Sequence, residues 1–242
     1  MDLSDPGRLG QRLLARQLDE QMSAAFEAER RLRILDVGLG RGVQALRLAR
    51  AGHGVTGLQS DPDLRELFEK DLAEEPEEIR GRVRLVAGGG EDTGVHFLPG
   101  TFDVVMCHGG LLQSRDPGTT LAGLARVLAA GGLLSLVIRN DAALAMHPGR
   151  AGDWDAALAA LDFPDRTGSA LRLETLTRSL AGIGTPLRQW YGVGVFGRDD
   201  CPADEEKAER MLAVEERAGR ADPYRSVAAM LHLCGVRGGD GG

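Results

Sequence analysis

Short apolar runs alternate with segments of helical periodicity along the first 138 residues, and this alternation limits the fold more than any other feature of the sequence. Each run is long enough for one strand, and turns with glycine or proline separate the units. Alternation of strand and helix at this spacing predicts a parallel sheet with right-handed crossovers and helices on both faces. The apolar runs lie at residues 34–37, 55–58, 83–87, 102–107 and 133–138.

The remaining chain completes the predicted sheet. Residues 187–196 and 229–236 read as two more strands, so we predict a doubly wound, mostly parallel, seven-stranded α/β sheet in a single domain, residues 1–242. Because residues 187–196 contain glycines at positions 192 and 194, they form either one strand with a bulge or two pieces. We expect an N-terminal helical cap over 1–30 and a flexible, glycine-rich tail over 237–242.

Residues 139–170 interrupt the strand and helix rhythm. They hold two short helical pieces around Trp154 and follow the fifth strand. Ligands of open α/β sheets bind outside the carboxyl ends of the strands, which is the edge where this segment begins. We therefore predict that residues 139–170 form a lid over the ligand site.

Charge and cysteine content exclude some classes of function. The formal net charge of −7 argues against broad, sequence-independent binding of nucleic acid, although Arg8, Arg12 and Arg16 line one face of the first predicted helix. That face is either solvated or a local basic surface. The three cysteines are far apart and in no CxxC pair, so we expect neither disulfides nor a bound metal. No membrane span or signal peptide is apparent, so we expect a cytoplasmic protein.

A glycine-rich turn follows the first predicted strand and opens a helix. Its sequence from Asp36 has the spacing DxGxGxG, with glycines at Gly38, Gly40 and Gly42. Backbone N–H groups at such a turn can meet a ligand's negative end, and glycine lets the ligand approach closely. A dinucleotide fingerprint would be GxGxxG, but Val43 occupies the place of its third glycine, which disfavours a nicotinamide cofactor.

The turn resembles the first motif of class I S-adenosylmethionine-dependent methyltransferases. The resemblance implies that Asp36 lies near the cofactor's amino group and that the three glycines pass beside its methionine portion. It also places Gln59, where that family usually has an acidic residue, at the ribose hydroxyls. Glu91 and Asp92 fall where the family contacts adenine, and the sequence does not decide between them.

A wider resemblance covers nearly the whole chain and is closest to the tRNA 5-carboxymethoxyuridine methyltransferase family, which esterifies a carboxylate on a wobble uridine. It rests on FDVVMCHGGLLQSRDP, LSLVIRNDAALAMH, YGVGVF and DPYRSVAAMLHL. His108 matches a histidine beside the cofactor, and Asn140 and His147 match positions on the acceptor side. These three residues are the candidate catalytic residues, while Tyr224 and His232 match positions of unclear role. The implied acceptor is tRNA.

Two departures from the family pattern leave other functions open. The family's N-terminal arginine, expected to pair with the cofactor carboxylate, falls opposite Gly10, so Arg8 or Arg12 would have to replace it. Leu112 and Gln113 stand where the family has acidic and aromatic residues. The alternatives are therefore a small-molecule O- or N-methyltransferase and a non-catalytic S-adenosylmethionine-binding protein. The oligomeric state is not readable from the sequence.

Overall fold

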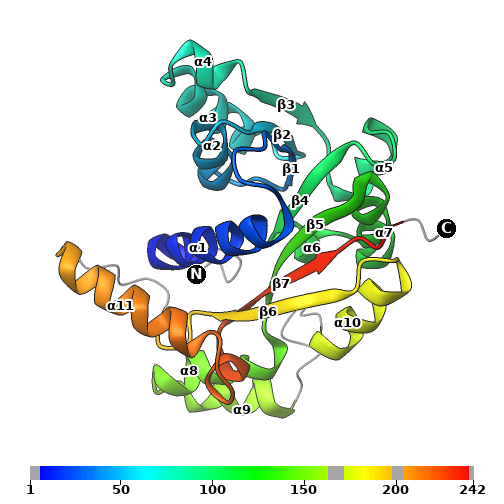
Figure 1. Ribbon diagram of the computed structural model, residues 1–242. Coiled ribbons are helices and arrows are strands. Elements are labelled where there is room, and N and C mark those ends of the chain that lie inside the picture. Colours follow the sequence, from blue (N-terminus) through cyan, green and yellow to red (C-terminus); the bar gives the residue numbers. More distant parts are fainter. Residues whose placement is uncertain (1–5, 163–171, 198–203, 240–242) are drawn as a thin grey trace.

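The computed structural model describes residues 6–162, 172–197 and 204–239. Within them, seven strands form one sheet in the order β3-β2-β1-β4-β5-β7-β6, with β7 antiparallel to both of its neighbours and the other pairs parallel (Figure 1). The predicted mostly parallel, seven-stranded sheet is confirmed. Its strands are β1 (Arg33–Val37), β2 (Gly54–Gln59), β3 (Val83–Ala87), β4 (Phe102–His108), β5 (Leu128–Arg139), β6 (Leu187–Val193) and β7 (Met230–Val236).

Helices cover both faces of the sheet. Apolar side chains of α1, α2 and α3 pack on one face, and those of α6, α7 and α10 pack on the other. Proline follows an aspartate N-cap at the start of both α3 and α7, which fixes where these helices begin. The helices are α1 (Gly7–Ala25), α2 (Val43–Arg50), α3 (Pro62–Ala73), α4 (Glu77–Arg80), α5 (Thr93–His96), α6 (Gly110–Gln113), α7 (Pro117–Val127), α8 (Met146–Arg150), α9 (Trp154–Asp162), α10 (Leu173–Gly182) and α11 (Glu205–Ala218).

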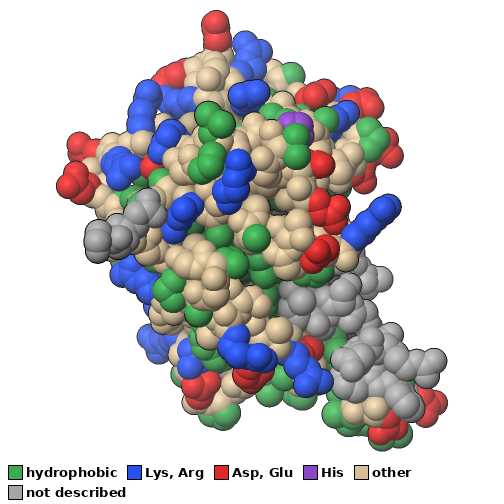
Figure 2. All heavy atoms as spheres, turned by 90° about the vertical axis from the view of Figure 1, so that its right-hand side faces the viewer, with side chains coloured by type: hydrophobic (Ala, Val, Ile, Leu, Met, Phe, Trp, Pro, Cys, Tyr) green, Lys and Arg blue, Asp and Glu red, His purple; other side chains and the backbone are tan. Residues whose placement is uncertain are grey.

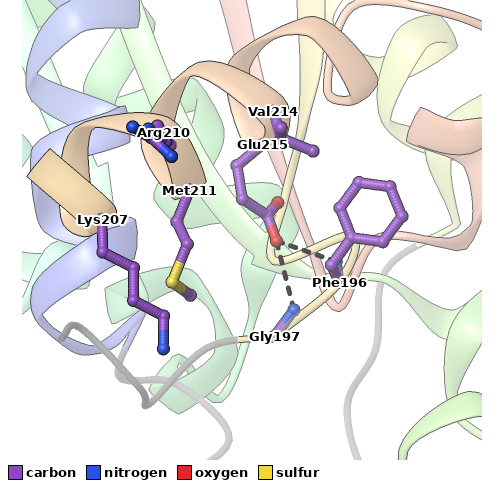
Figure 3. Close-up of a pocket in the computed structure, with 7 residues that line it drawn as sticks. All are labelled: Phe196, Gly197, Lys207, Arg210, Met211, Val214 and Glu215. Carbon is purple, nitrogen blue, oxygen red and sulfur yellow. Dashed lines mark hydrogen bonds between the residues drawn. The ribbon is translucent and has the colours of Figure 1, made fainter.

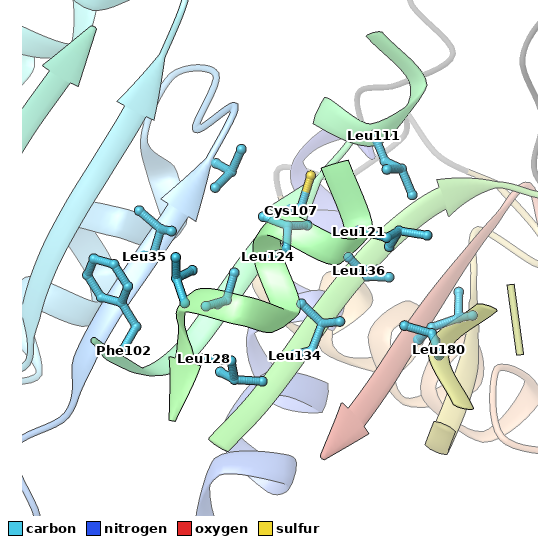
Figure 4. Packing of buried hydrophobic residues seen from close by; sticks show 14 of the residues in the cluster. Leu35, Phe102, Cys107, Leu111, Leu121, Leu124, Leu128, Leu134, Leu136 and Leu180 are labelled. Carbon is cyan, nitrogen blue, oxygen red and sulfur yellow. The ribbon is translucent and has the colours of Figure 1, made fainter. Parts of the chain in front are cut away.

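Strand alternation divides the core between the two faces. On β4, Val104 and Met106 pack toward α1 and α2, whereas Val105 and Cys107 pack toward α7. All four side chains are fully buried, as expected for central strands of a parallel sheet. Figure 4 shows the face of the sheet that α7 covers, where leucines of α7 lie against β4 and β5. His108 continues the register of Val104 and Met106, so it lies on the α1 side.

Several boundaries differ from the sequence prediction. The first helix ends at Ala25 rather than near residue 30. Strand β5 begins at Leu128 rather than at the start of the apolar run 133–138, because Leu128 pairs with Phe102 and a bulge follows. A register shift in β6 between Leu187 and Gln189 supports the reading of one bulged strand.

The first residue of the predicted flexible tail is hydrogen-bonded to neighbouring elements. Arg237 lies in the predicted flexible tail, yet its backbone bonds to Gly131 and Gly132, and its guanidinium donates to the carbonyls of Ala125 and Leu128. Residues 240–242 lie outside the described residues. Among the described helices, none combines the length and apolar character needed to cross a lipid bilayer.

Candidate active site

The turn from β1 into α2 carries three glycines in the left-handed backbone region. The φ angles of Gly38, Gly40 and Gly42 are +68°, +56° and +71°. A Cβ atom on Gly42 would overlap the Phe68 ring, so this glycine serves packing. A Cβ on Gly40 would meet nothing within 4 Å, so it would project into open space. Gly40 therefore leaves the backbone accessible to a ligand at the start of α2.

A cavity of about 800 Å³ opens beside this turn. Its walls come from the turn, the carboxyl end of β4 and the first turns of α1. A volume of this order lies within the range of about 300–1,000 Å³ typical of small-molecule sites. Asp36, Gly38, Gly40 and His108 all line the cavity, so the structure brings four of the predicted site residues together.

Asp36 supplies an acidic group at the cavity floor. Its side chain is buried, and burial raises the pKa of Asp36 to about 7. Within the described residues it has no hydrogen-bond or ion-pair partner. A cationic ligand group such as an ammonium would restore the ionised form and make a charge-assisted hydrogen bond there.

His108 ends β4 at the cavity wall and is held from inside the protein. Its Nε2 lies 2.8 Å from Ser135 Oγ on β5. Burial, and secondarily the positive charge of Arg47, lower the pKa of His108 to about 4. The imidazole is therefore neutral at physiological pH and a weak base.

Arginines give the cavity rim a positive character. Arg8, Arg12, Arg41 and Arg47 all line it. Arg12 pairs with Glu205 and Glu209 of α11, Arg41 lies 3.6 Å from Asp71, and Arg47 lies 2.7 Å from Asp19. Within the described residues, Arg8 alone of the four has no carboxylate partner. Of the two arginines expected to replace the family arginine, Arg8 is thus the better placed to bind a ligand carboxylate.

Most of the basic face of the first helix is covered by α11, so it is neither a solvated face nor a free basic surface. Arg16 pairs with Glu209 and Glu216, and Arg12 pairs with the same acidic helix. These ion pairs fasten α1 to α11. Only Arg8, one turn earlier, points its charge to the cavity without an acidic neighbour among the described residues.

The predicted ribose and adenine contacts lie at the same carboxyl edge of the sheet but outside the cavity lining. Gln59 ends β2, is buried, and accepts a hydrogen bond from the Asp61 backbone N–H at 3.2 Å. Asp61 is the N-cap of α3, where its side chain accepts from the backbone N–H groups of Asp63 and Leu64. Asp92 accepts from the Gly89 N–H at 2.8 Å, and Glu91 accepts from the Arg115 N–H at 2.7 Å.

Asn140 and His147 are not brought together with His108. The buried Asn140 amide donates to the carbonyls of Ser226 and Ala228 and accepts from the Ala142 N–H, so it fastens the start of the loop after β5. Neither Asn140 nor His147 lines the cavity, nor does any other described residue of 139–170. The described wall opposite the glycine turn is α1. The lid therefore stays a prediction, and residues 163–170 of it lie outside the described residues.

Sequence reasoning did not identify Gln17 and Ser135, and it left His232 without a role. All three are fully buried and hydrogen-bonded behind His108. One signal was available, because Ser135 is a polar residue inside the apolar run of β5. No periodicity argument could show that Gln17 of α1 meets a strand more than two hundred residues away.

A second, smaller cavity of about 330 Å³ lies between α11 and the segment that follows β6 (Figure 3). The Glu215 carboxylate accepts hydrogen bonds from the backbone N–H groups of Phe196 and Gly197, as the dashed lines show, and from that of Val195. Glu215 thus closes the turn after β6. This cavity shares no lining residue with the first.

Comparisons with known proteins find similarity to methyltransferases. A family model described as a methyltransferase domain matches residues 35–136, from β1 to β5. The chain is 28% identical over 239 residues to a tRNA 5-carboxymethoxyuridine methyltransferase of Escherichia coli O157:H7, covering 94% of this chain and 87% of the relative. It is 34% identical over 116 residues to a ubiquinone biosynthesis O-methyltransferase of Xanthomonas euvesicatoria, covering 47% and 46%.

The fold is shared with solved methyltransferase structures. One example is the 1,6-didemethyltoxoflavin-N1-methyltransferase of Burkholderia thailandensis with bound S-adenosylhomocysteine, which matches with a TM-score of 0.57 and 15% identity over 96% of this chain and 79% of that one. The glycine turn, the buried Asp36 and the adjoining cavity fit S-adenosylmethionine. The chain is an S-adenosylmethionine-dependent methyltransferase and has the class I methyltransferase fold.

Proposed function

We propose that this methyltransferase esterifies a carboxylate on a modified wobble uridine of tRNA, and that it works in the cytoplasm. The observation that carries the proposal is the neutral, weakly basic His108 at the cavity wall, whose pKa burial lowers to about 4. Similarity over nearly the whole length to a relative named for this activity supports the same acceptor.

A carboxylate suits a site without a strong base. It is already ionised at neutral pH, so it can attack a methyl group without first losing a proton. A phenol or an amine would gain from a general base of pKa near 7. His108 is too weak a base for that task. Asp36, whose pKa is about 7, also lines the cavity, and we assign it to the cofactor's ammonium group rather than to proton abstraction from an acceptor.

The chain's own residues would hold the cofactor and orient the acceptor. We propose that Asp36 binds the cofactor ammonium, Arg8 its carboxylate, the backbone at Gly40 its methionine portion and Gln59 its ribose. S-adenosylmethionine supplies an electrophilic methyl group on sulfur. The protein then contributes alignment of the acceptor oxygen with that methyl group, which is the main requirement of an in-line displacement.

Positive charge at the cavity rim favours an anionic acceptor. Arg8 and Arg41 are exposed there; Arg8 has no carboxylate partner among the described residues, and Arg41 lies 3.6 Å from Asp71. Elsewhere the surface charge is less favourable for binding the phosphates of an RNA ligand. On the face seen in Figure 2, basic and acidic side chains are interspersed. We therefore infer that tRNA contacts are concentrated near the cavity, in keeping with the net charge of −7.

A small-molecule O-methyltransferase is the second candidate. It is favoured by the 34% identity to ubiquinone biosynthesis O-methyltransferases. That match covers 47% of this chain, so it leaves the acceptor side unsupported. An O-methyl ether and a methyl ester differ in one convenient property, because alkali hydrolyses the ester to methanol and leaves the ether intact.

The test uses methyl-labelled S-adenosylmethionine with the purified chain and a bulk tRNA substrate that lacks the terminal methyl group. We expect label in the RNA fraction that mild alkali releases as volatile methanol. The matched variants are Arg8→Gln, which should lower transfer, and Arg16→Gln, which removes a charge held by α11 outside the cavity and should leave transfer near wild type. Alkali-stable label in small molecules would support the second candidate. Cofactor binding with no transfer to any fraction would support a non-catalytic binding protein.

A further inference from the structure

A chain of buried hydrogen bonds runs from the cavity wall into the protein. His108 Nε2 lies 2.8 Å from Ser135 Oγ, and Ser135 Oγ lies 2.8 Å from His232 Nε2. His232 Nδ1 then lies 2.8 Å from Gln17 Oε1. Ser135, His232 and Gln17 have no solvent exposure, so their polar groups depend on partners inside the protein. Cys234 Sγ also lies 3.3 Å from His232 Nε2, where its thiol can donate beside the Ser135 hydroxyl.

The sheet topology brings the four residues together. His108, Ser135 and His232 lie on the neighbouring strands β4, β5 and β7, with their side chains on the face that α1 covers. Gln17 projects from α1 onto that face. Burial and the charge of neighbouring His108 hold the pKa of His232 well below its ordinary value, so both imidazoles are neutral and each carries one N–H.

In a hydrogen-bond chain of this kind, all the donors can point either toward the cavity or away from it. The groups at the buried end, next to Gln17, decide between these two directions. Gln17 Oε1 faces His232, which leaves Gln17 Nε2 buried without a partner. One helical turn later, Gln21 Oε1 is also buried without a partner. The two unpaired atoms, the donor Gln17 Nε2 and the acceptor Gln21 Oε1, belong to residues at helix positions i and i+4, so a small side-chain rotation can pair them. With the Gln17 amide reversed, two oxygens would face each other instead.

The far end of the chain has a fixed polarity. Gln21 Nε2 donates to the Tyr191 hydroxyl at 2.6 Å, and Tyr191 in turn contributes to lowering the pKa of the Glu20 carboxyl. Arg220 first, and then Tyr191, hold the pKa of Glu20 below its ordinary value, so Glu20 is ionised and can only accept. No hydrogen bond joins Gln17 to Gln21 among the described residues, so the donor direction at His232 is set by Gln17 Oε1, which can only accept.

We propose that Gln17, His232 and Ser135 are positioning residues that hold His108 in a single tautomer, with its proton on Nε2 and a lone pair on Nδ1. Within the described residues Nδ1 has no partner, and His108 lines the cavity. Nδ1 is then a fixed hydrogen-bond acceptor for a donor on the bound ligand, such as an ammonium or a ribose hydroxyl. Its use in methyl transfer rests on the proposed function, whereas the tautomer itself does not.

The tautomers can be measured in the ligand-free, full-length chain. With ¹⁵N-labelled histidine, long-range ¹H–¹⁵N correlation spectra distinguish the two neutral forms. Among the five histidines, His53 is an internal reference, because its Nδ1 accepts from the Leu32 N–H and its proton must sit on Nε2. We expect His108 to carry its proton on Nε2 and His232 to carry its proton on Nδ1. The reverse pair of tautomers, or an imidazolium at either position near pH 7, would overturn the proposal.

Substitutions test whether the buried hydrogen bonds set the tautomers of His108 and His232. Ser135→Ala should leave His232 unchanged and give His108 a mixture of tautomers, whereas Gln17→Leu should perturb both. Gln17→Glu retains the acceptor and should preserve both tautomers. The control is Thr185→Val, which removes another fully buried polar group, one that donates to the Leu180 carbonyl and lines neither cavity. Unchanged tautomers in Gln17→Leu would show that the chain does not set them.

Cofactor affinity gives an independent readout. Loss of the fixed acceptor in Gln17→Leu should weaken S-adenosylmethionine binding about fivefold by calorimetry, the scale of one net hydrogen bond, and Gln17→Glu should restore it. Altered tautomers with wild-type affinity would refute the positioning role. Because neither measurement uses an acceptor, failure of the tRNA proposal leaves both results interpretable.

Discussion

The buried carboxyl group of Asp36 should make the ligand-free protein less stable as the pH rises. Burial raises its pKa from 3.8 to about 7, so between these values the native state keeps a proton that the unfolded state has lost. Stability is therefore fully present below pH 3.8 and falls as the pH rises through about 7. Asp36→Asn removes the titrating group while nearly preserving its shape.

The size of the effect follows from the pKa difference. The interval from 3.8 to about 7, at about 1.4 kcal/mol per pH unit, corresponds to an upper limit of about 4 kcal/mol. Urea unfolding of the cofactor-free protein should show wild type and Asp36→Asn nearly equal at pH 4. At pH 8 the variant should be more stable by up to about 4 kcal/mol. The same variant should bind S-adenosylmethionine far more weakly, because an amide cannot neutralise an ammonium.

Asp103 is a control of opposite sign. Burial alone would raise its pKa, but the hydrogen bonds and charge of Arg33, together with Arg30, hold the pKa of Asp103 below its ordinary value. Asp103→Asn should thus reduce stability at pH 8 and matter less in acid. A difference between wild type and Asp36→Asn that stays constant from pH 4 to pH 8 would refute the reasoning, as would unimpaired cofactor binding by the variant.

Three further predictions concern the cofactor site. Gly40→Val should abolish calorimetric binding of S-adenosylmethionine in a chain that still folds, since the valine side chain would enter open space. Gly42→Ala should instead lower the melting temperature, because the added Cβ would overlap the Phe68 ring. Gln59→Glu should keep or tighten cofactor binding by offering the ribose a charge-assisted hydrogen bond, and a large loss would place the ribose elsewhere. Arg8→Gln should weaken cofactor binding about tenfold, the scale of a charged hydrogen bond, with Arg16→Gln near wild type as the comparison.

The fold was predictable because local signals and tertiary structure agree along the first five strands. Apolar runs set the strands, and Pro62 and Asp61 fix the start of α3 as the sequence indicates. Gly40 was recognisable because a left-handed turn directly after a strand needs glycine. These features depend on residues close in sequence, so short-range reasoning reaches them.

What escaped prediction depends on contacts between distant residues. The cavity wall formed by α1 and the burial of Gln17 against β7 arise only when the N-terminal helix docks on the C-terminal strands. Asn140 matched a position on the acceptor side, yet here its amide is occupied by the backbone near Ala228. A match of residue type carries no information about which hydrogen bonds that residue makes.

The docking of α1 also explains how relatives that resemble this chain only over the matched domain, residues 35–136, can methylate different acceptors. The matched methyltransferase domain ends at residue 136, but the cavity is completed by Arg8 from α1. The position of α1 is in turn set by Glu209 of α11 and by His232 of β7, both beyond that domain. Sequence change in the last forty residues can therefore reshape the wall facing the methyl donor without altering the glycine turn. Acceptor identity should follow similarity over the whole chain rather than over the matched domain.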